Sequence, residues 1–268
     1  MKRSVFTSKP FISALAVVLA LGLGACTVKK KEYVEQPVEK IYNSAMDALL
    51  NRNYQEAAEK FDEVERQHPY SQWATKAQLM SAYTYYLNNV YSDAIVGLNR
   101  FIQLHPTNKD VPYAYYLKGL SYYEQISDVA RDQKMTELAL GTLDELIKRF
   151  PNSKYARDAK LKIDLTYDHL AGKEMEIGRF YHNQGNYLAA INRYRTVVED
   201  YQTTTHVPEA LHRLTEAYLS LGVTEEARKT AAVLGHNFPG SVWYMDSYKI
   251  MGNEVDTPEA ANPWYKIW

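Results

Sequence analysis

One thiol and seven imidazoles are the side chains of this sequence with the clearest chemical potential. Cys26 is the only cysteine among 268 residues, so no disulfide can form within one chain. It follows an apolar run over 11–23, which itself follows the basic start Met1-Lys2-Arg3. A basic start, a short apolar stretch and small residues at its end are typical of a secretory signal. The thiol therefore lies where such a signal is cut.

The residues just before the thiol specify what happens to it. Leu23, Gly24 and Ala25 precede Cys26 as in the bacterial lipobox. This resemblance implies a diacylglycerol group on the Cys26 thiol, removal of residues 1–25 and acylation of the new amine, and two or three acyl chains anchor firmly. Thr27, where an Asp tends to retain lipoproteins in the inner membrane, points to the outer membrane. Two alternatives stay open: an ordinary buried cysteine and a signal without lipid.

The histidines are not accompanied by the pattern of a catalytic or metal site. The sequence contains no HExxH, no GxSxG and no glycine-rich phosphate loop. His68 and His105 both stand just before a proline, which indicates a structural position. A net charge of −1 gives no strong field for nucleic acid. We therefore expect no catalytic residue, no metal, no cofactor and no nucleic acid, although a scattered catalytic constellation would escape this search.

An internal repeat supplies the elements that would position functional side chains. Five amphipathic stretches end in similar tails, and an alanine lies 12 residues before the proline of each tail, or before Gln202 in the fourth. The tails are HPYS (68–71), HPTN (105–108), FPNS (150–153), YQTT (201–204) and FPGS (238–241), and the alanines are Ala57, Ala94, Ala139, Ala190 and Ala227. This is the tetratricopeptide pattern of two antiparallel helices per unit of about 34 residues. We predict an all-α solenoid of five helix pairs.

The same pattern predicts how the two helices of a unit meet. A small residue on the first helix lets the second approach, and a large residue on the second fills the gap to the next unit. The small residues are Ala82, Gly119, Gly178 and Thr215, and the large ones are Phe61, Leu98, Leu143 and Tyr194. Tyrosines that hold the consensus place on the first helices are expected in the core, namely Tyr85, Tyr122, Tyr181 and Tyr218.

The spacing of the third and fourth tails indicates a longer helix. It exceeds one unit by about four helical turns at 3.6 residues each. We expect one helix over 155–181, with Gly172 as a weak point, to bridge repeats 3 and 4. The predicted organisation is a cleaved signal (1–25), a lipidated tether (26–37), an N-terminal block of repeats 1–3 (38–153), the bridging helix with repeats 4–5 (154–251), and a flexible tail (252–268). The role of Trp264 and Trp268 in that tail stays open.

The sequence contains 23 tyrosines, and several of them lie on the first helices, whose concave surface binds peptides in repeat arrays of this kind. Tyrosine offers broad apolar area and a hydroxyl at low entropic cost. The predicted precursor-binding groove holds Tyr42, Tyr83, Tyr86, Tyr116 and Tyr123, and the alternative is that several of these are core. An insertion in the third repeat is the second candidate, because loops on a rigid array often bind. It carries Asp128, Arg131 and Asp132, and a solvated loop is its alternative.

Lipobox, repeats, long helix and insertion together resemble one family. The stretches that carry the resemblance best are GLSYYEQISDVARDQ (119–133) and ELIKRFPNSKYARDA (145–159). The chain resembles the BamD family, also called ComL or YfiO, over nearly all of the mature part. The resemblance implies a non-enzymatic lipoprotein on the periplasmic face of the outer membrane, part of the BAM complex, which scaffolds BamA and helps recognise, insert and fold β-barrel precursors.

The resemblance also implies a division of labour along the chain. The N-terminal repeats would receive unfolded precursors, and the C-terminal repeats would contact BamA and other BAM subunits. Arg193 matches the Asn-Arg pair of the family and is the expected contact to an acidic group of BamA, with Arg195 as the substitute. Two other classes remain: a tetratricopeptide lipoprotein of another envelope machine, such as a secretin pilotin or a peptidoglycan-linked coordinator, and a cell-wall enzyme.

Overall fold

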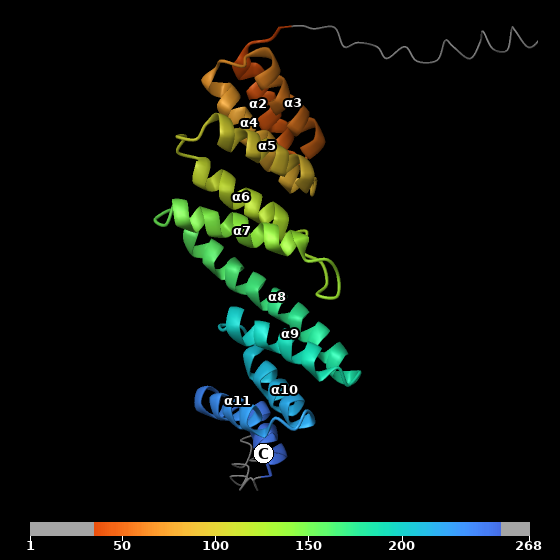
Figure 1. Ribbon diagram of the computed structural model, residues 1–268. Coiled ribbons are helices and arrows are strands. Elements are labelled where there is room, and N and C mark those ends of the chain that lie inside the picture. The colour runs from red at the N-terminus through yellow and green to blue at the C-terminus, as the bar shows by residue number, and fades with distance from the viewer. Residues whose placement is uncertain (1–34, 253–268) are drawn as a thin grey trace, which may run out of the picture. The chain divides into compact units, whose positions relative to one another are not determined.

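The computed structural model describes residues 35–252, in which all regular structure is helical (Figure 1). Cys26, Thr27, Trp264 and Trp268 lie outside the described residues. The helices are α2 (Val38–Leu50), α3 (Tyr54–Gln67), α4 (Gln72–Leu87), α5 (Tyr91–Leu104), α6 (Val111–Tyr123), α7 (Lys134–Arg149), α8 (Ala156–Asn183), α9 (Tyr187–Asp200), α10 (Val207–Ser220), α11 (Thr224–Asn237) and α12 (Val242–Ile250). Within 35–252, no helix combines the length and the apolar character that crossing a membrane requires.

The helices pair as the repeat predicts. Each odd-numbered helix from α3 to α11 packs against the helix before it, which gives five pairs, and each pair packs against the next. The prediction of five helix pairs is confirmed. Helix α12 follows as a single extra helix that the repeat count did not predict, and it packs against α10 and α11.

The close approach within each pair is visible at the small residues. The five alanines that define the repeat are all 0% exposed. A Cβ added to Gly119 would lie 2.5 Å from Leu143 Cδ2, and one added to Gly178 would lie within 3.0 Å of three ring atoms of Tyr194. The small residues therefore admit the second helix as predicted, but in the third and fourth pairs the large residue packs against the small one within the same unit, which the repeat did not predict.

The tails end one helix and begin the next. His68 and His105 are the residues that close α3 and α5, with their backbone N–H groups donating to Val64 O and Phe101 O. Ser71 then caps α4, because its Oγ accepts a hydrogen bond from the backbone N–H of Ala74 at 3.1 Å. Pro69, between His68 and Ser71, cannot donate a backbone hydrogen bond, which favours a break between α3 and α4 at this position. The structural position predicted for the two histidines is confirmed.

The bridging helix is continuous over 28 residues from Ala156 to Asn183. Gly172 is not the weak point that its residue type indicated. A Cβ at Gly172 would lie 3.2 Å from His206 Nε2 and 3.4 Å from Val129 Cγ1. The glycine therefore lets the insertion and the loop before α10 approach the helix, and this packing keeps it helical.

The core consists of three clusters along the array. Their fully buried members include Phe61 in the first, Leu98 and Phe101 in the second, and Met175 and Tyr194 in the third. The four tyrosines predicted for the core are half-buried. Tyr181 and Tyr218 pack against the third cluster, which agrees with that expectation, whereas Tyr85 and Tyr122 belong to none of the three clusters, which corrects it. The division into blocks at residues 153 and 154 stays a prediction.

Candidate functional site

Aromatic rings of three first helices meet in a continuous surface that we call the tyrosine belt. It consists of Tyr83 and Tyr86 of α4, Tyr113 and Tyr116 of α6, and Tyr155, the residue before α8. Ring centroids are 6.5 Å apart for Tyr83 and Tyr113, 5.3 Å for Tyr113 and Tyr155, and 5.2 Å for the stacked pair Tyr116 and Tyr155. All five rings are half-buried, so each keeps a solvent-facing part.

Carboxylates fix the hydroxyl groups at the edge of the belt. Tyr86 OH donates to Glu124 Oε1 at 3.4 Å, and Tyr116 OH donates to Asp158 Oδ2. Burial, followed by the charge of Glu124, raises the pKa of Tyr86 to about 12. Burial also raises the pKa of Tyr113 and Tyr116. The phenols are therefore neutral donors at physiological pH, and their rings are held in place before any partner arrives.

The structure separates two of the predicted groove residues from the belt. Tyr42 packs in the first core cluster, with its ring 5.5 Å from Phe61 and 4.8 Å from Trp73. Tyr123 lies at the end of α6, where Lys162 Nζ sits 4.9 Å from its ring centroid. The structure thus brings Tyr83 and Tyr116 into one row of contacting rings through Tyr113 and Tyr155. Tyr86 packs against the same core cluster, and its ring contacts that of Tyr91. Tyr42 and Tyr123 lie outside that row.

Two belt residues, Tyr113 and Tyr155, were missed by the sequence reasoning, although the sequence holds a signal for each of them. An aromatic residue stands four positions after the tail proline in three repeats, at Trp73, Tyr155 and Trp243. In each case its ring contacts a ring of the preceding first helix: Tyr42, Tyr116 and His212 respectively. Tyr113 could have been found from Tyr116, because residues three apart on a helix are neighbours.

The insertion in the third repeat is an ordered loop. Gln133, 8% exposed, donates from Nε2 to the carbonyl groups of Asp128, Val129 and Arg131 at 3.0–3.4 Å. Asp128 Oδ1 also accepts a hydrogen bond from the backbone N–H of Ala130 at 2.8 Å. This arrangement leaves the side chains of Asp128, Arg131 and Asp132 exposed.

The insertion is also fixed to the bridging helix. Lys173 Nζ of α8 donates to the carbonyl group of Ala130 at 2.9 Å. A cavity of about 410 Å³ opens beside this contact, and Arg131, Glu174 and Tyr201 contribute to its lining. The loop therefore presents its charges from a defined position on the array.

The two arginines predicted for a partner contact have intramolecular partners. Arg193 Nη1 of α9 lies 3.1 Å from Glu174 Oε2 of α8, and the arginine side chain is 43% exposed. Arg195 pairs with Glu199 one turn further along α9, at 2.7 Å, and both side chains are exposed. Since Glu174 also lines the cavity beside the insertion, Arg193 connects α9 to that cavity.

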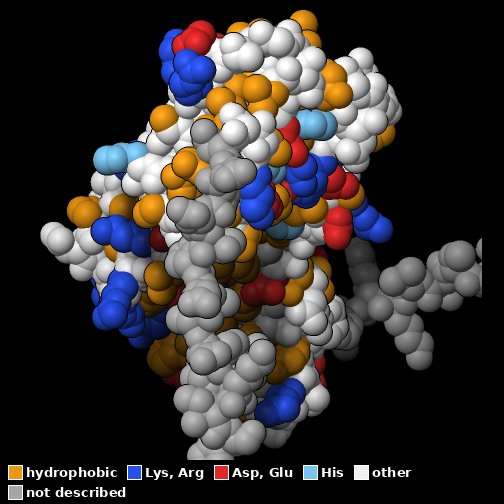
Figure 2. Space-filling view, turned by 90° about the horizontal axis from the view of Figure 1, so that it is seen from below, with side chains coloured by type: hydrophobic (Ala, Val, Ile, Leu, Met, Phe, Trp, Pro, Cys, Tyr) orange, Lys and Arg blue, Asp and Glu red, His pale blue; other side chains and the backbone are white. Residues whose placement is uncertain are grey.

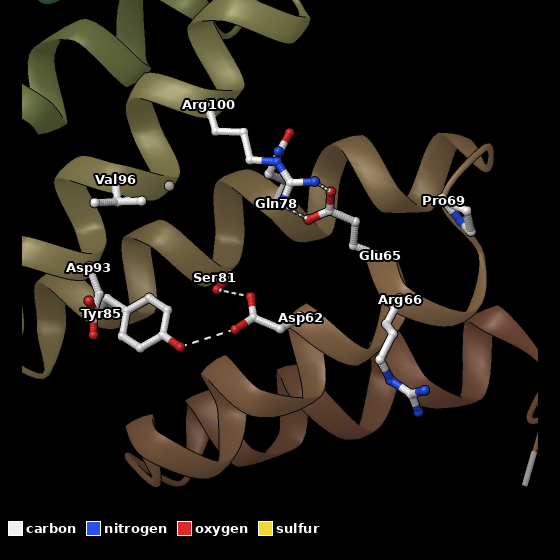
Figure 3. A pocket seen from close by; sticks show the side chains of 11 residues that line it. Asp62, Glu65, Arg66, Pro69, Gln78, Ser81, Tyr85, Asp93, Val96 and Arg100 are labelled. Carbon is white, nitrogen blue, oxygen red and sulfur yellow. Dashed lines mark hydrogen bonds and ion pairs between the residues drawn. The ribbon is translucent and has the colours of Figure 1, made fainter. Parts of the chain in front are cut away.

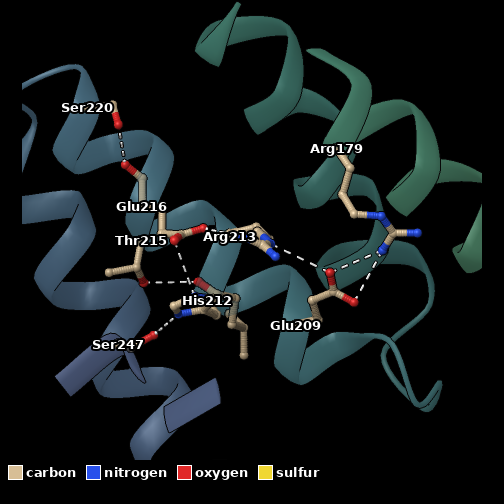
Figure 4. A network of polar contacts seen from close by, with 9 residues as sticks. Arg179, Glu209, His212, Arg213, Thr215, Glu216, Ser220 and Ser247 are labelled. Carbon is tan, nitrogen blue, oxygen red and sulfur yellow. Dashed lines mark hydrogen bonds and ion pairs between the residues drawn. The ribbon is translucent and has the colours of Figure 1, made fainter. Parts of the chain in front are cut away.

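A chain of polar contacts joins α8 to α12 at the C-terminal end (Figure 4). Arg179 of α8 binds Glu209, which also faces Arg213, and Arg213 binds Glu216 at 2.8 Å. His212 lies next in this chain, with Nε2 3.5 Å from Glu216. Its Nδ1 lies 2.8 Å from Ser247 Oγ of α12, and its ring lies 5.3 Å from that of Trp243. The buried imidazole therefore fixes the extra helix to α10.

The described residues contain no candidate metal centre, and the face seen in Figure 2 carries charges of both signs. In residues 35–252, no group of three His, Cys, Asp or Glu side chains is placed to hold a metal ion. Seen from below, lysine, arginine, aspartate and glutamate side chains lie interspersed with hydrophobic ones (Figure 2).

Comparison with known proteins gives one consistent result. The model of the YfiO family, described as an outer membrane lipoprotein, matches residues 34–234. An outer membrane protein assembly factor BamD of Caulobacter vibrioides is 49% identical over 93% of this chain and 83% of its own length. The corresponding factor of Rickettsia prowazekii is 48% identical over 90% and 96%. A tetratricopeptide protein of Thermus thermophilus is similar in structure, with a TM-score of 0.39 and 19% identity over 80% of this chain and 98% of that one.

Proposed function

The chain belongs to the YfiO family of outer membrane lipoproteins, also known as BamD, and we propose that its tyrosine belt receives unfolded β-barrel precursors. Its function is outer membrane protein assembly, as a lipoprotein component of the BAM complex. The protein is located in the outer membrane. The anchor, the face of the membrane and the contacts with partner proteins are finer points of this function, and each is a separate proposal.

The anchor we propose is Cys26, with its lipid in the outer membrane and the helices on the periplasmic face. The lipobox supports this, and so does the basic and apolar segment before it. The tether 26–37 then keeps the array near its partners and raises their effective concentration. Metabolic labelling with a fatty acid tests the anchor: wild type carries label, and Cys26→Ser carries none. Label on the Cys26→Ser chain would contradict the assignment.

The observation that carries precursor capture is the row of ring contacts from Tyr83 through Tyr113 and Tyr155 to Tyr116, with Tyr86 of α4 packed against the same core cluster. An extended strand presents alternate side chains to one side, and a row of aromatic faces gives them apolar contact without strict sequence preference. Because Glu124 and Asp158 already hold two of the hydroxyls, little side-chain entropy is lost on binding. We therefore infer that the belt binds the terminal strand of a precursor and acts as a scaffold rather than as an enzyme.

Photocrosslinking to an unfolded precursor tests the belt. Tyr83→Ala combined with Tyr86→Ala should reduce the yield strongly, while Tyr248→Ala, which changes an exposed tyrosine of α12, should not. Tyr116→Phe keeps the ring and loses the bond to Asp158, so its effect should be smaller. Unchanged crosslinking in the double variant, with its helix content intact, would remove precursor binding from the belt.

The BamA contact we propose lies on α9, with Arg193 as the main residue. Its guanidinium is half-exposed beside Glu174, so a partner carboxylate can share it without a large movement. Arg131 and Asp132 of the insertion line the same 410 Å³ cavity as Glu174, the partner of Arg193. Arg193→Gln should weaken copurification of BamA from mild detergent more than Arg195→Gln does. The control is Arg228→Gln, which removes an exposed pair on α11. Equal recovery from all three variants would refute the contact.

A further inference from the structure

A small apolar cavity lies in the C-terminal half of the array, between α9, α10 and α11. Its volume is about 200 Å³, which is below the range of about 300–1,000 Å³ that is usual for ligand pockets. Leu211 and Leu214 of α10 are its buried residues, and Val198 of α9 and Tyr218 of α10 are half-buried beside them. Val233 of α11, 44% exposed, lines the cavity at the surface. The cavity therefore offers apolar contact to a single side chain.

The repeat forms the same cavity a second time, between α3, α4 and α5 (Figure 3). Each residue that lines the C-terminal cavity lies 133 positions after a residue that lines the N-terminal one, which is also the distance between the repeat alanines Ala57 and Ala190. The two cavities differ in chemistry at four of these positions. The residues Val198, Leu211, Leu214 and Val233 correspond to Glu65, Gln78, Ser81 and Arg100.

The polar residues of the N-terminal cavity bind one another. Arg100 Nη2 lies 2.6 Å from Glu65 Oε1, and Ser81 Oγ donates to Asp62 Oδ1 at 2.5 Å. Valine and leucine at the corresponding positions of the C-terminal cavity cannot form such bonds. Their apolar surface gains free energy only by being removed from water. Of the two cavities, the C-terminal one is therefore suited to an apolar occupant.

Exposed cations beside this cavity favour an aromatic occupant. Arg195 of α9 and Lys229 of α11 both contribute to the lining. Each is held only by an exposed pair on its own helix, with Glu199 at 2.7 Å and with Glu226 at 2.6 Å. Pairs of this kind contribute little to stability, so either cation can turn towards a ring. Among aromatic side chains, tryptophan binds a cation best.

The chain itself carries two tryptophans within reach of the cavity, Trp264 and Trp268, which lie outside the described residues. The described part ends at Gly252, just after α12, and α12 packs against α10 and α11. The 12 residues from Gly252 to Trp264 can span up to about 40 Å. Helix α11, with 14 residues, is only about 21 Å long. The tail can therefore reach the cavity from the end of α12.

We propose that the C-terminal tail binds this cavity within the same chain, with the indole of Trp264 against Leu211, Leu214 and Val233. Because the ring of Pro263 fixes its φ, less backbone freedom is lost when the neighbouring tryptophan docks. The guanidinium of Arg195 and the ammonium of Lys229 then face the indole. This contact goes beyond precursor capture and the BamA contact, and it depends on neither.

Fluorine NMR of the full chain in mild detergent tests the proposal. Each of the four tryptophans carries a 5-fluoro label, and its signal is assigned with the corresponding Trp→Phe variant. A signal shifts between H₂O and D₂O only where solvent reaches the ring, so the Trp264 signal should shift little. Val233→Asp places a charge in the cavity and should restore the full shift. Val96→Asp, which changes an exposed valine that lines the N-terminal cavity, should leave the Trp264 signal protected.

The outcomes separate the possible occupants. A fully solvent-exposed Trp264 in the wild type, or protection that survives Val233→Asp, would overturn the proposal. Protection that grows with protein concentration would assign the cavity to a second copy, and protection that arises only in the assembled BAM complex would assign it to a partner. Either result would overturn docking within the chain. Val233→Ser, a milder change at the same exposed position, should also weaken the protection if the aspartate variant does not fold.

Discussion

The same substitution at two helix glycines should change stability in opposite directions. Gly178 of α8 is buried against Tyr194, and an added Cβ would lie within 3.0 Å of three atoms of that ring. Gly141 of α7 is exposed, and an added Cβ would meet nothing within 4 Å. Both glycines lie inside helices, so alanine brings each the same gain in helix propensity. The comparison therefore isolates the contact between α8 and α9.

The magnitude follows from two terms. Alanine in place of glycine stabilises a helix interior by about 0.5–1 kcal/mol. Overpacking a tight core costs about 1–3 kcal/mol, and Tyr194 has no room to yield because it is 0% exposed. Gly141→Ala should therefore raise the melting temperature by about 1–4 °C, taking about 2–4 °C per kcal/mol for a domain of this size. Gly178→Ala should lower stability by up to about 2 kcal/mol, which is the overpacking cost less the propensity gain.

The assay is thermal unfolding of each full-length variant, followed by circular dichroism at matched concentration. Gly119→Ala adds an intermediate case, because its Cβ would meet the branched end of Leu143, which can change rotamer with a smaller displacement than a tyrosine ring, although Leu143 is also 0% exposed. The expected order of melting temperatures is Gly141→Ala, then Gly119→Ala, then Gly178→Ala. If Gly178→Ala melted as high as Gly141→Ala, the fit of the Tyr194 ring against α8 would be refuted.

Three further predictions concern single polar groups. The hydrogen bond from His212, with a further one from Arg213, holds the pKa of Glu216 at about 2, against an ordinary value of 4.5. The stability that this carboxylate contributes is therefore present above pH 4.5 and is lost as the pH falls towards 2. In Glu216→Gln, the free energy of unfolding should fall less steeply between pH 4.5 and pH 2 than in the wild type. Tyr194 OH is buried without a partner among the described residues, so Tyr194→Phe should leave stability unchanged or raise it by up to about 1 kcal/mol in urea titration. Gln133→Leu removes the donor that holds three carbonyl groups of the insertion, so amide exchange over 128–131 should accelerate while α8 keeps its protection.

The repeat could be predicted because it is written in local spacing. The alanine 12 residues before each tail proline is buried in every unit, and its burial depends only on the helix that carries it and the helix beside it. Helix caps can be predicted for the same reason, because donor and acceptor are close in sequence: Ser71 Oγ accepts from the backbone N–H of Ala74, three residues later. The long helix 156–183 was readable from the surplus length between two tails.

The candidate site could be predicted only in part. Tyr83, Tyr86 and Tyr116 were named from their place on the first helices. Tyr155 precedes a different helix and reaches Tyr116 only because the start of α8 lies near α6 in the folded chain. Tyr42 fitted the same pattern and instead packs against Trp73 in the first cluster. Which rings touch depends on the rotation of each helix about its axis, and residue spacing does not fix that rotation between helices.

By itself the sequence determined the class of the protein, the number of helix pairs, their small and large contact residues and the lipobox at Cys26. These depend on short-range periodicity, which 3.6 residues per turn convert directly into faces. Only the tertiary structure decided that Gly172 admits His206 and Val129, that Arg193 already holds Glu174, and that Gln78 Nε2 is buried without a partner among the described residues. The first two join residues at least 19 positions apart in sequence, so the three-dimensional stacking of the helices creates them.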